Sequence, residues 1–499
     1  MNNIYGRKAE MAELKRLYDS PKAEFLAVYG RRRVGKTFLI TRFFDNKFAF
    51  YHSGLSPYGE KDEDDFLKQM DADSLEDANK NKMRDQLDHF AESLMDCGCK
   101  LERPLANWRE AFRELKNLIK PMLSSRERIV IFIDELPWMD TPKSGFLKEF
   151  ESFCNSFACR FDSIFLIVAG SNITWIDDFL INGYGGLYDR LTTEMKLSPL
   201  SLKETGEYLS KGKGISFSRY DLTFAYMVFG GIPYYLDKFQ KGKSLPAIID
   251  QCFFEKNATM RNEFKRLFLS SFRKGKEIQR IVEILSKRSI GYTRDDIIKG
   301  LGMSSGSNIS DMLDSLEHAD FIMKYNPLGE RKNVTYYRLI DPFCLFYLRF
   351  VKSSSAFDET LFSGIAASNA VRVWRGFAFE TVCFNHISQI KKALGIAAVA
   401  TKQYAYLQRG SDECQGAQID LVIDRADNIV NLCEIKFFKT KYEHDKTEHE
   451  RLLNKEAALE KAVLKTKSIR NVLITTIGII DGVYAGDFDS VITLDDLFE

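Results

Sequence analysis

The residues with the clearest chemistry lie between Gly30 and Thr37, where the chain reads Gly-Arg-Arg-Arg-Val-Gly-Lys-Thr. In this spacing, G-x-x-x-x-G-K-T, two glycines let the loop turn so tightly that its backbone N–H groups point at phosphate oxygens. A lysine at this place reaches the β- and γ-phosphates, and the hydroxyl beside it can ligate Mg²⁺. The pattern predicts a site for a nucleoside triphosphate and its magnesium ion.

The segments on either side of this loop are of the kind that hold it in place. Residues 25–29 are an apolar run typical of a buried strand, and residues 38–44 follow as a helix whose N-terminus faces the anion. We expect Thr37 to hold Mg²⁺ and Lys36 to act in catalysis as well as in binding. The residues expected to bind ATP are Gly30, Arg31, Arg32, Arg33, Val34, Gly35, Lys36, Thr37 and Phe38.

Two further apolar runs, residues 129–133 and 163–169, end in polar residues. Asp134 is expected to hold Mg²⁺ and Glu135 to polarise the attacking water as general base; the alternative is two surface acids that cap a strand. Asn172 either orients this water or senses the γ-phosphate, or it is the N-cap of the next helix. Since open α/β sheets bind ligands at the carboxyl ends of their strands, these runs predict a parallel sheet with its site at that edge.

Arg190, within Leu-Tyr-Asp-Arg-Leu at 187–191, is a further catalytic candidate. An arginine there can reach a phosphate of its own chain or, in a homo-oligomer, of a neighbouring subunit. The spacing alone is equally compatible with a surface arginine that has no catalytic role.

A second group of polar residues lies near the C-terminus, on two runs expected to pair as antiparallel strands. Asp420 lies in the first run. Glu434 and Lys436 lie in the second and, being two residues apart, point to the same face. Because unpaired charges are costly among apolar residues, the carboxylates are expected to hold Mg²⁺ while Lys436 orients or deprotonates a water. The alternative is a satisfied salt bridge on the face of a sheet.

The first set of motifs resembles a known family. Its segments, at 5–10, 29–37, 133–138 and 230–235, are similar to those of the prokaryotic AAA+-like ATPases often called archaeal-type ATPases, relatives of the STAND signalling NTPases. The resemblance covers roughly residues 1–345. It implies that the Gly6-Arg7 segment lies near the base of the nucleotide and that the Gly-x-Pro segment, within residues 230–235, lies in a helical lid. It also implies that Arg190 is a sensor arginine or an arginine finger.

The C-terminal pattern resembles the PD-(D/E)XK nuclease superfamily over about residues 370–495. The helix expected at 374–383 looks like the N-terminal helix of those domains, which often carries a further acid, and Glu380 matches it as another metal ligand. Ile419 stands where that pattern has a proline, a common substitution. The resemblance implies a nuclease-like fold and leaves retained cleavage open.

The expected fold class is α/β, with a P-loop NTPase parallel sheet, a helical lid, a winged helix-turn-helix and a C-terminal restriction-endonuclease-like α/β domain. The winged helix is indicated by helical patterns after residue 277, among them a candidate recognition helix from Ser304, followed by short β-rich runs. DNA contact and a protein-docking or lid role are equal alternatives for it. The expected boundaries are an AAA+-like ATPase domain at 1–200, the lid at 201–275, the winged helix at 276–350, a linker at 351–369 and the nuclease-like domain at 370–499.

Composition sets wider limits. The formal net charge of the 499 residues is +1, so overall charge does not indicate a nucleic-acid partner. The nine cysteines include no CxxC pair, which argues against a zinc ribbon and favours a reducing cytoplasm. No run approaches a membrane span. The acid-rich stretch 60–96 predicts a solvated helical insertion, and His444 and His449, five residues apart, are expected on the solvated face of a charged helix.

Together the two groups of polar residues predict an ATP-binding, Mg²⁺-dependent ATPase whose nucleotide state controls a fused DNA-binding or nuclease-like module. The alternative is a STAND-type signalling ATPase in which the nuclease-like domain is an inactive scaffold.

Overall fold

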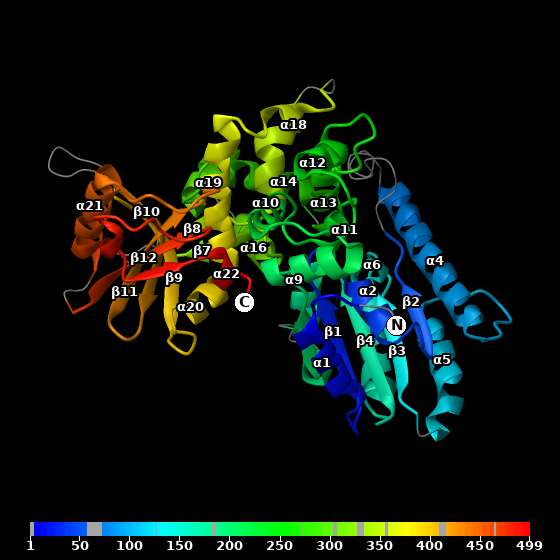
Figure 1. Cartoon of the computed structure of the whole chain (residues 1–499). Coiled ribbons are helices and arrows are strands. Elements are labelled where there is room, and N and C mark those ends of the chain that lie inside the picture. The colour runs from blue at the N-terminus through cyan, green and yellow to red at the C-terminus, as the bar shows by residue number, and fades with distance from the viewer. Residues whose placement is uncertain are drawn as a thin grey trace. The chain divides into compact units, whose positions relative to one another are not determined.

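The chain forms two compact units, the first comprising residues 1–198 with 270–273 and the second residues 199–269 with 274–499. Figure 1 follows the chain from blue at the N-terminus to red at the C-terminus. The computed structural model describes residues 4–56, 72–125, 127–181, 186–272, 274–302, 307–326, 334–354, 358–408, 416–463 and 466–499.

The first unit is built on a five-stranded sheet in which every strand pair is parallel. In spatial order the strands are β2 (Phe50–Ser53), β3 (Ile129–Asp134), β4 (Ile164–Gly170), β1 (Glu24–Tyr29) and β5 (Thr193–Lys196). Strands β3 and β4 are buried along their whole length, which is why they appear in the sequence as unbroken apolar runs. The predicted parallel sheet is confirmed.

An aromatic core fixes helices to this sheet. Helix α5 (Trp108–Ile119) begins at Asn107, whose side chain accepts the backbone N–H of Glu110 at 3.0 Å. Its apolar side meets α7 (Phe146–Phe153), with the rings of Trp108 and Phe146 centred 4.8 Å apart. Other helices in the described part of this unit are α1 (Lys8–Tyr18), α2 (Lys36–Phe43), α4 (Ala72–Asp96), α6 (Leu136–Met139) and α8 (Ile173–Ile176). Helix α4 accounts for the C-terminal part of the predicted acidic insertion; residues 57–71 lie outside the described ranges.

The second unit contains two sheets. A three-stranded antiparallel sheet has the order β6 (Tyr292–Thr293), β8 (Tyr336–Leu339), β7 (Ile322–Tyr325). A five-stranded mixed sheet has the order β13 (Ser490–Ile492), β12 (Ser468–Thr475), β11 (Ile429–Lys436), β10 (Ala417–Arg425), β9 (Thr401–Gln408). Strands β10 and β11 pair antiparallel, as expected from the sequence.

Helices surround these sheets. Three of them, α14 (Gly275–Leu285), α15 (Arg294–Leu301) and α16 (Ser307–His318), precede β7 and β8 in the order expected of a winged helix. Thr293 caps α15 in a reciprocal pair with Asp296. Residues 303–306, at the predicted start of the recognition helix, lie outside the described ranges. The others are α9 (Leu202–Glu207), α10 (Arg219–Phe229), α11 (Pro233–Leu236), α12 (Leu245–Phe253), α13 (Glu263–Ser271), α17 (Pro342–Phe346), α18 (Leu361–Ile365), α19 (Asn369–Asn385), α20 (Ile387–Ala393), α21 (Lys446–Ala462) and α22 (Leu494–Leu497).

The expected modules of this second unit are joined by buried contacts. Tyr325 of β7 belongs to the same hydrophobic core as Tyr404 and Tyr406 of β9. Residues 361–365, expected in a linker, instead form α18, and the buried carboxylate of Asp250 accepts the backbone N–H groups of Phe362 at 2.8 Å and Ser363 at 2.9 Å. Residues 199–269 and 274–499 therefore pack as one body. None of the helices described is long and apolar enough to cross a membrane.

Candidate functional site

Strand order brings the predicted nucleotide site together at one edge of the parallel sheet. Strand β4 lies between β1 and β3. The residues that follow β4 therefore stand between the Gly30–Thr37 loop, which follows β1, and Asp134, which ends β3. All three connections leave the sheet at its carboxyl edge, as the sequence predicted.

Backbone conformation makes the loop as tight as its sequence suggests. Gly30 has a φ of 149°, and a β-carbon placed on it would lie 2.2 Å from the backbone oxygen of Leu197. Gly35, with a φ of 94°, is the N-cap of α2. The loop thus delivers the chain directly into the N-terminus of a helix, where free N–H groups favour an anion.

The ammonium group of Lys36 is buried at the centre of the site. It donates hydrogen bonds to the backbone oxygens of Gly30 at 3.0 Å and Arg31 at 3.3 Å, and to Ser171 Oγ at 2.9 Å. Burial lowers the pKa of Lys36, while the charges of Glu135 and Asp134 act in the opposite direction. These contacts hold a cation among carbonyl and hydroxyl oxygens beside the loop.

Thr37 and Asp134 place two oxygen ligands side by side. Thr37 Oγ1 donates to Asp134 Oδ2 over 2.5 Å, and Asp134 Oδ1 accepts the backbone N–H of Glu135 at 2.9 Å. Burial, reinforced by the charge of Glu135, raises the pKa of Asp134 to about 6. Hard oxygen donors of this kind suit Mg²⁺, so the residues present fit the predicted ion.

Ser171 links Lys36 to Glu135. Its hydroxyl donates to Glu135 Oε1 at 2.6 Å, and its backbone N–H donates to Oε2 at 3.0 Å. The same hydroxyl oxygen accepts the hydrogen bond from Lys36 Nζ. Sequence reasoning missed Ser171, although it directly follows β4 in the same polar cluster as Asn172.

Asn172 is the N-cap of α8. Its Oδ1 accepts the backbone N–H of Trp175 at 3.1 Å. Asn172 is thus a helix N-cap, as in the second of the two alternatives given for it. Ser171, and not Asn172, contacts Lys36 and Glu135.

Arg190 lies at the other end of the sheet. It ends the short 3-10 helix η4 (Tyr188–Arg190) and donates from Nε to Asn155 Oδ1 at 2.8 Å. Two residues later, the backbone N–H of Thr192 bonds to the oxygen of Phe25 at the start of β1. The six residues of β1 span roughly 20 Å, so Arg190 is about that far from the loop that follows the strand. A role on the phosphates of its own chain is not compatible with this position.

The N-terminal Gly6-Arg7 segment packs against the phosphate-binding loop. The buried Arg7 donates from Nη2 to the backbone oxygens of Val34 at 3.3 Å and Ser198 at 2.6 Å. Its Nη1 pairs with Glu10 at 3.1 Å. This places the segment beside the phosphate-binding loop; its position near the base of the nucleotide stays a prediction.

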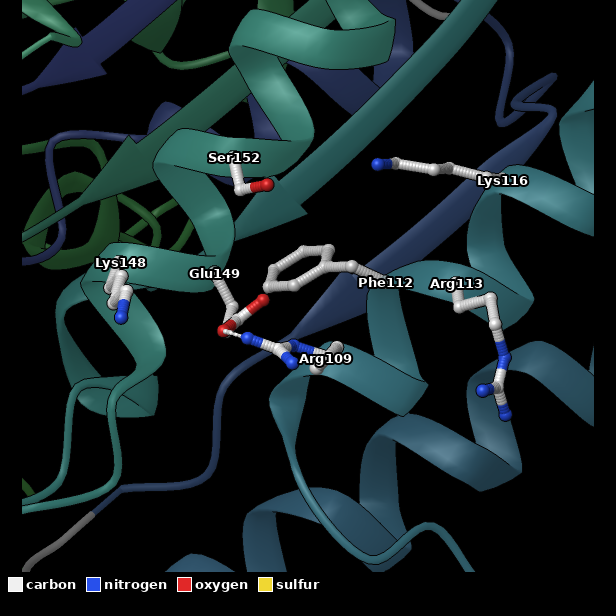
Figure 2. Close-up of a pocket in the computed structure, with 7 residues that line it drawn as sticks. All are labelled: Arg109, Phe112, Arg113, Lys116, Lys148, Glu149 and Ser152. Atoms are coloured by element: carbon white, nitrogen blue, oxygen red, sulfur yellow. Dashed lines mark hydrogen bonds and ion pairs between the residues drawn. The ribbon is translucent and has the colours of Figure 1, made fainter.

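A hollow of about 400 Å³ opens elsewhere in the first unit, between α5 and α7 (Figure 2). Figure 2 shows Arg109 and Glu149 pointing toward each other, and their side chains pair at 3.3 Å. Lys116 donates to Ser156 Oγ at 2.8 Å. The hollow carries four cations against one carboxylate, a balance that attracts anions. Its lining residues are Arg109, Phe112, Arg113, Lys116, Lys148, Glu149 and Ser152.

The second predicted group of polar residues meets in the second unit, on β10 and β11. A bulge in the pairing of β9 with β10 spans residues 419–422 and so includes Asp420. Glu434 has a lysine on each oxygen, Lys436 at 3.0 Å from Oε1 and Lys455 at 2.6 Å from Oε2. Burial alone would raise the pKa of Glu434, but these two cations outweigh it and hold the pKa below its ordinary value. Sequence reasoning missed Lys455, which comes from α21.

Glu380, the third predicted carboxylate, pairs with an arginine. Its Oε2 lies 3.1 Å from Nη2 of Arg338 in β8, and both side chains are buried. Burial and, after it, the charge of Asp420 raise the pKa of Glu380 to about 8. Burial, followed by the charge of Glu434, also raises the pKa of Asp420.

This arrangement differs from the magnesium site expected from the sequence. Among the residues that the structure describes, Asp420, Glu434 and Glu380 do not form a group whose carboxylate oxygens converge within 4.8 Å. Instead, Arg338 of β8 pairs with Glu380, while Lys436 of β11 and Lys455 of α21 pair with Glu434. For Glu434 and Lys436, the salt-bridge alternative describes the geometry.

The prediction for His444 was wrong. His444 precedes α21 and is buried, so it lies neither in the charged helix nor on a solvated face, whereas His449 lies within α21 and is partly exposed. His444 Nε2 lies 2.9 Å and His449 Nδ1 2.6 Å from the same atom, Asp487 Oδ2. The spacing of five residues was misleading because α21 begins only at Lys446.

Residues 4–239 match a family described as an ATPase domain predominantly from Archaea. An uncharacterized protein of Methanocaldococcus jannaschii is 24% identical over 422 residues, which make up 83% of each protein. An uncharacterized ATP-binding protein of the same organism is 51% identical over 41 residues, 8% of this chain and 70% of that protein.

Two solved structures show more distant similarity. The Walker-type ATPase PABY2304 of Pyrococcus abyssi is 20% identical, with a TM-score of 0.43 over 70% of this chain and 96% of that one. The ORC2 protein of Aeropyrum pernix, solved as ADPNP–ADP complexes, is 12% identical, with a TM-score of 0.38 over 73% of this chain and 96% of that one.

Proposed function

We propose that this chain, which carries an archaeal-type ATPase domain over residues 4–239, is a Mg²⁺-dependent ATP hydrolase. The observation that carries the proposal is the hydrogen-bonded series from Lys36 through Ser171 to Glu135, next to the Thr37–Asp134 pair. It combines a phosphate-binding cation, a pair of oxygen ligands and a base at one edge of one sheet.

Each part has a role in binding. The backbone of the Gly30–Thr37 loop and the N-terminus of α2 take the phosphates, and Lys36 exchanges loop carbonyls for phosphate oxygens. Thr37 and Asp134 would hold Mg²⁺, which when bound neutralises charge on the β- and γ-phosphates.

Glu135 is the proposed general base. Ser171 binds both oxygens of its carboxylate, one through its hydroxyl and one through its N–H, so the side chain has a fixed direction. A base that is already oriented accepts the proton of a bound water without the cost of reordering. The contact between Ser171 and Lys36 ties that direction to the group that binds the phosphates.

The test is the rate of ATP hydrolysis by the full chain and by Lys36→Ala. The matched control is Lys47→Ala, which removes a lysine whose side chain is 83% exposed. We expect Lys36→Ala to lose at least about 100-fold in rate and the control to keep the wild-type rate, the scale at which loss of positioned charge acts in such sites. Equal rates in wild type and Lys36→Ala would overturn the proposal.

The nucleotide state is proposed to control the second unit, with its nuclease-like C-terminal part acting as a binding or scaffold module. The pairing of both Glu434 oxygens with lysines, and of Glu380 with Arg338, favours this alternative over cleavage. Digestion of several DNA and RNA forms with Mg²⁺ or Mn²⁺ separates the two. Metal-dependent cleavage by wild type that is lost in Glu434→Ala would establish the enzyme and refute the scaffold.

DNA is a proposed partner of the second unit. The order of α14, α15 and α16 followed by β7 and β8 supports it, because helices in this order can place one in a major groove. Binding of a labelled duplex should weaken steeply with salt. Binding that is absent at low salt would exclude this partner.

A further inference from the structure

Three side chains from separate segments converge outside both sites described above. His444 lies before α21, His449 lies within it, and Asp487 ends the short 3-10 helix η7 (Ala485–Asp487). One ligand atom from each lies within 4.8 Å of the other two. We propose that His444, His449 and Asp487 bind a divalent transition-metal ion, with Zn²⁺ the best fit to their chemistry.

The ligand types carry the choice of metal. Two imidazole nitrogens and a carboxylate are a set that Zn²⁺ takes, whereas Mg²⁺ prefers oxygen alone. Around a tetrahedral Zn²⁺, ligand atoms stand roughly 3.3 Å apart, given metal–ligand bonds of about 2 Å. The nitrogens now lie 2.9 Å and 2.6 Å from Asp487 Oδ2, so only a small opening of the group is needed.

The three proposed ligands differ in how far their side chains are exposed to solvent. The His444 side chain is 3% exposed, His449 is 25% exposed and Asp487 is 23% exposed. One side of the group is thus held by the protein and the other faces solvent. An ion has a path of entry, and a water can complete its coordination.

Neighbouring groups already orient the ligands. His444 Nδ1 lies 3.4 Å from the Tyr442 hydroxyl, which in turn donates to Glu448 at 3.2 Å. The His449 ring stacks on Tyr484, with centroids 4.5 Å apart. The side chain of Asn471 donates to the backbone oxygen of Asp487 at 3.0 Å. Outer contacts of this kind fix imidazole orientation in metal sites.

The rival is a hydrogen-bonded His–Asp group that binds no ion. In that case protons on His444 Nε2 and His449 Nδ1 point at Asp487 Oδ2. Zn²⁺ would replace those protons, so binding should release protons and weaken as pH falls. A group that only bonds internally would show neither effect.

The experiment is a titration of the chelator-treated full chain with Co²⁺, in excess Mg²⁺ and without nucleotide, followed by visible absorption. We expect one equivalent to bind with the bands of a low-symmetry, near-tetrahedral ion, and Zn²⁺ to displace it. His449→Ala and Asp487→Ala should each weaken binding at least ten-fold, since each removes one of three protein ligands. His89→Ala, which leaves the proposed ligands and their neighbours intact, should not weaken it.

Unfolding is separated from loss of a ligand by a second measurement. His449 is partly exposed, so the metal-free His449→Ala protein should keep the wild-type melting temperature within a few degrees. Wild type that binds no Co²⁺ or Zn²⁺, or binding that is unchanged in His449→Ala and Asp487→Ala, would overturn the proposal.

Discussion

The guanidinium of Arg338 in β8 lies 3.1 Å from the carboxylate of Glu380 in α19, and their side chains are 2% and 7% exposed. Arg338 also lies over the ring of Phe384, 4.4 Å from its centroid. A pair this well buried depends on both partners, because removing either one leaves the other buried without its polar partner. The pair therefore connects β8 of the three-stranded sheet to α19, which packs against the five-stranded sheet.

Removing one partner of this pair should destabilise the second unit. We expect Arg338→Met to lower the free energy of unfolding by about 3 kcal/mol, the lower end for a broken buried pair, because Glu380 can take up a proton. The double variant Arg338→Met/Glu380→Leu should recover most of that loss. Urea denaturation of the three proteins measures both effects, and equal losses in single and double variants would contradict the role given to the pair.

Ser171→Ala should slow hydrolysis without preventing ATP binding. The change frees the Glu135 carboxylate from one of its two hydrogen bonds and removes an acceptor from Lys36. We expect kcat to fall about 10- to 100-fold, a modest part of what a positioned base contributes. Steady-state kinetics should show a much smaller change in KM.

The neighbouring residue provides the control for this prediction. Asn172→Ala removes an N-cap, which costs about 1 kcal/mol of stability but leaves the Lys36–Ser171–Glu135 contacts in place. Its kcat should stay close to wild type. A greater loss of kcat in Asn172→Ala than in Ser171→Ala would contradict this prediction and would support Asn172 as the residue that senses the γ-phosphate.

Arg190 should matter only between subunits. Because it lies at the far end of β1 from the phosphate-binding loop, we propose that it acts on the nucleotide of a neighbouring copy. Arg190→Ala should hydrolyse ATP at the wild-type rate at concentrations where the wild type is monomeric. At concentrations where it assembles, mixing Arg190→Ala with Lys36→Ala should restore part of the activity that each lacks. Loss of activity in monomeric Arg190→Ala would rule this out.

Acid should destabilise the second unit through His386. Its Nε2 accepts the backbone N–H of Leu202 at 2.9 Å, and its Nδ1 lies 2.8 Å from the oxygen of Val382. Burial lowers its pKa from 6.5 to about 4. Between these two values the unfolded chain binds a proton that the folded chain does not, so stability falls as pH falls from 6.5 to 4.

The size of this effect can be measured by comparison with His386→Gln, which retains a donor and an acceptor but does not titrate. Wild type should lose about 3 kcal/mol more than the variant over that window, and the difference should level off below pH 4. Denaturation at a series of pH values gives both slopes. Parallel slopes would show that His386 does not contribute.

Local patterns were enough to predict the parallel sheet and the elements that carry Lys36, Thr37 and Asp134. Each of these residues lies directly after an apolar run or within a short motif. The carboxyl ends of parallel strands meet at one edge of the sheet, independently of the other parts of the chain. Ser171 could not be ranked above Asn172 from adjacency alone, since its importance comes from β4 lying between β1 and β3. The cis alternative for Arg190 failed for a related reason: β5, the strand that follows Arg190, begins beside the start of β1.

Long-range partners limited the prediction for the second unit. Asp420, Glu434 and Lys436 were correctly expected on adjacent antiparallel strands. By contrast, Lys455 reaches Glu434, and Arg338 reaches Glu380, from elements that no local pattern connects to these strands. His444 and Asp487 are 43 residues apart, and a helix boundary decided where His444 points. Such contacts depend on tertiary packing, which a single sequence does not show.

The two hydrogen bonds that Asp250 accepts from α18 bear on how this protein can be divided for study. A gene cut within residues 352–358, where the serine-rich sequence suggests a natural break, would separate a buried carboxylate from its donors and leave both products with newly uncovered cores. A fragment meant to comprise the second unit should therefore begin near Pro199 and run through residue 499.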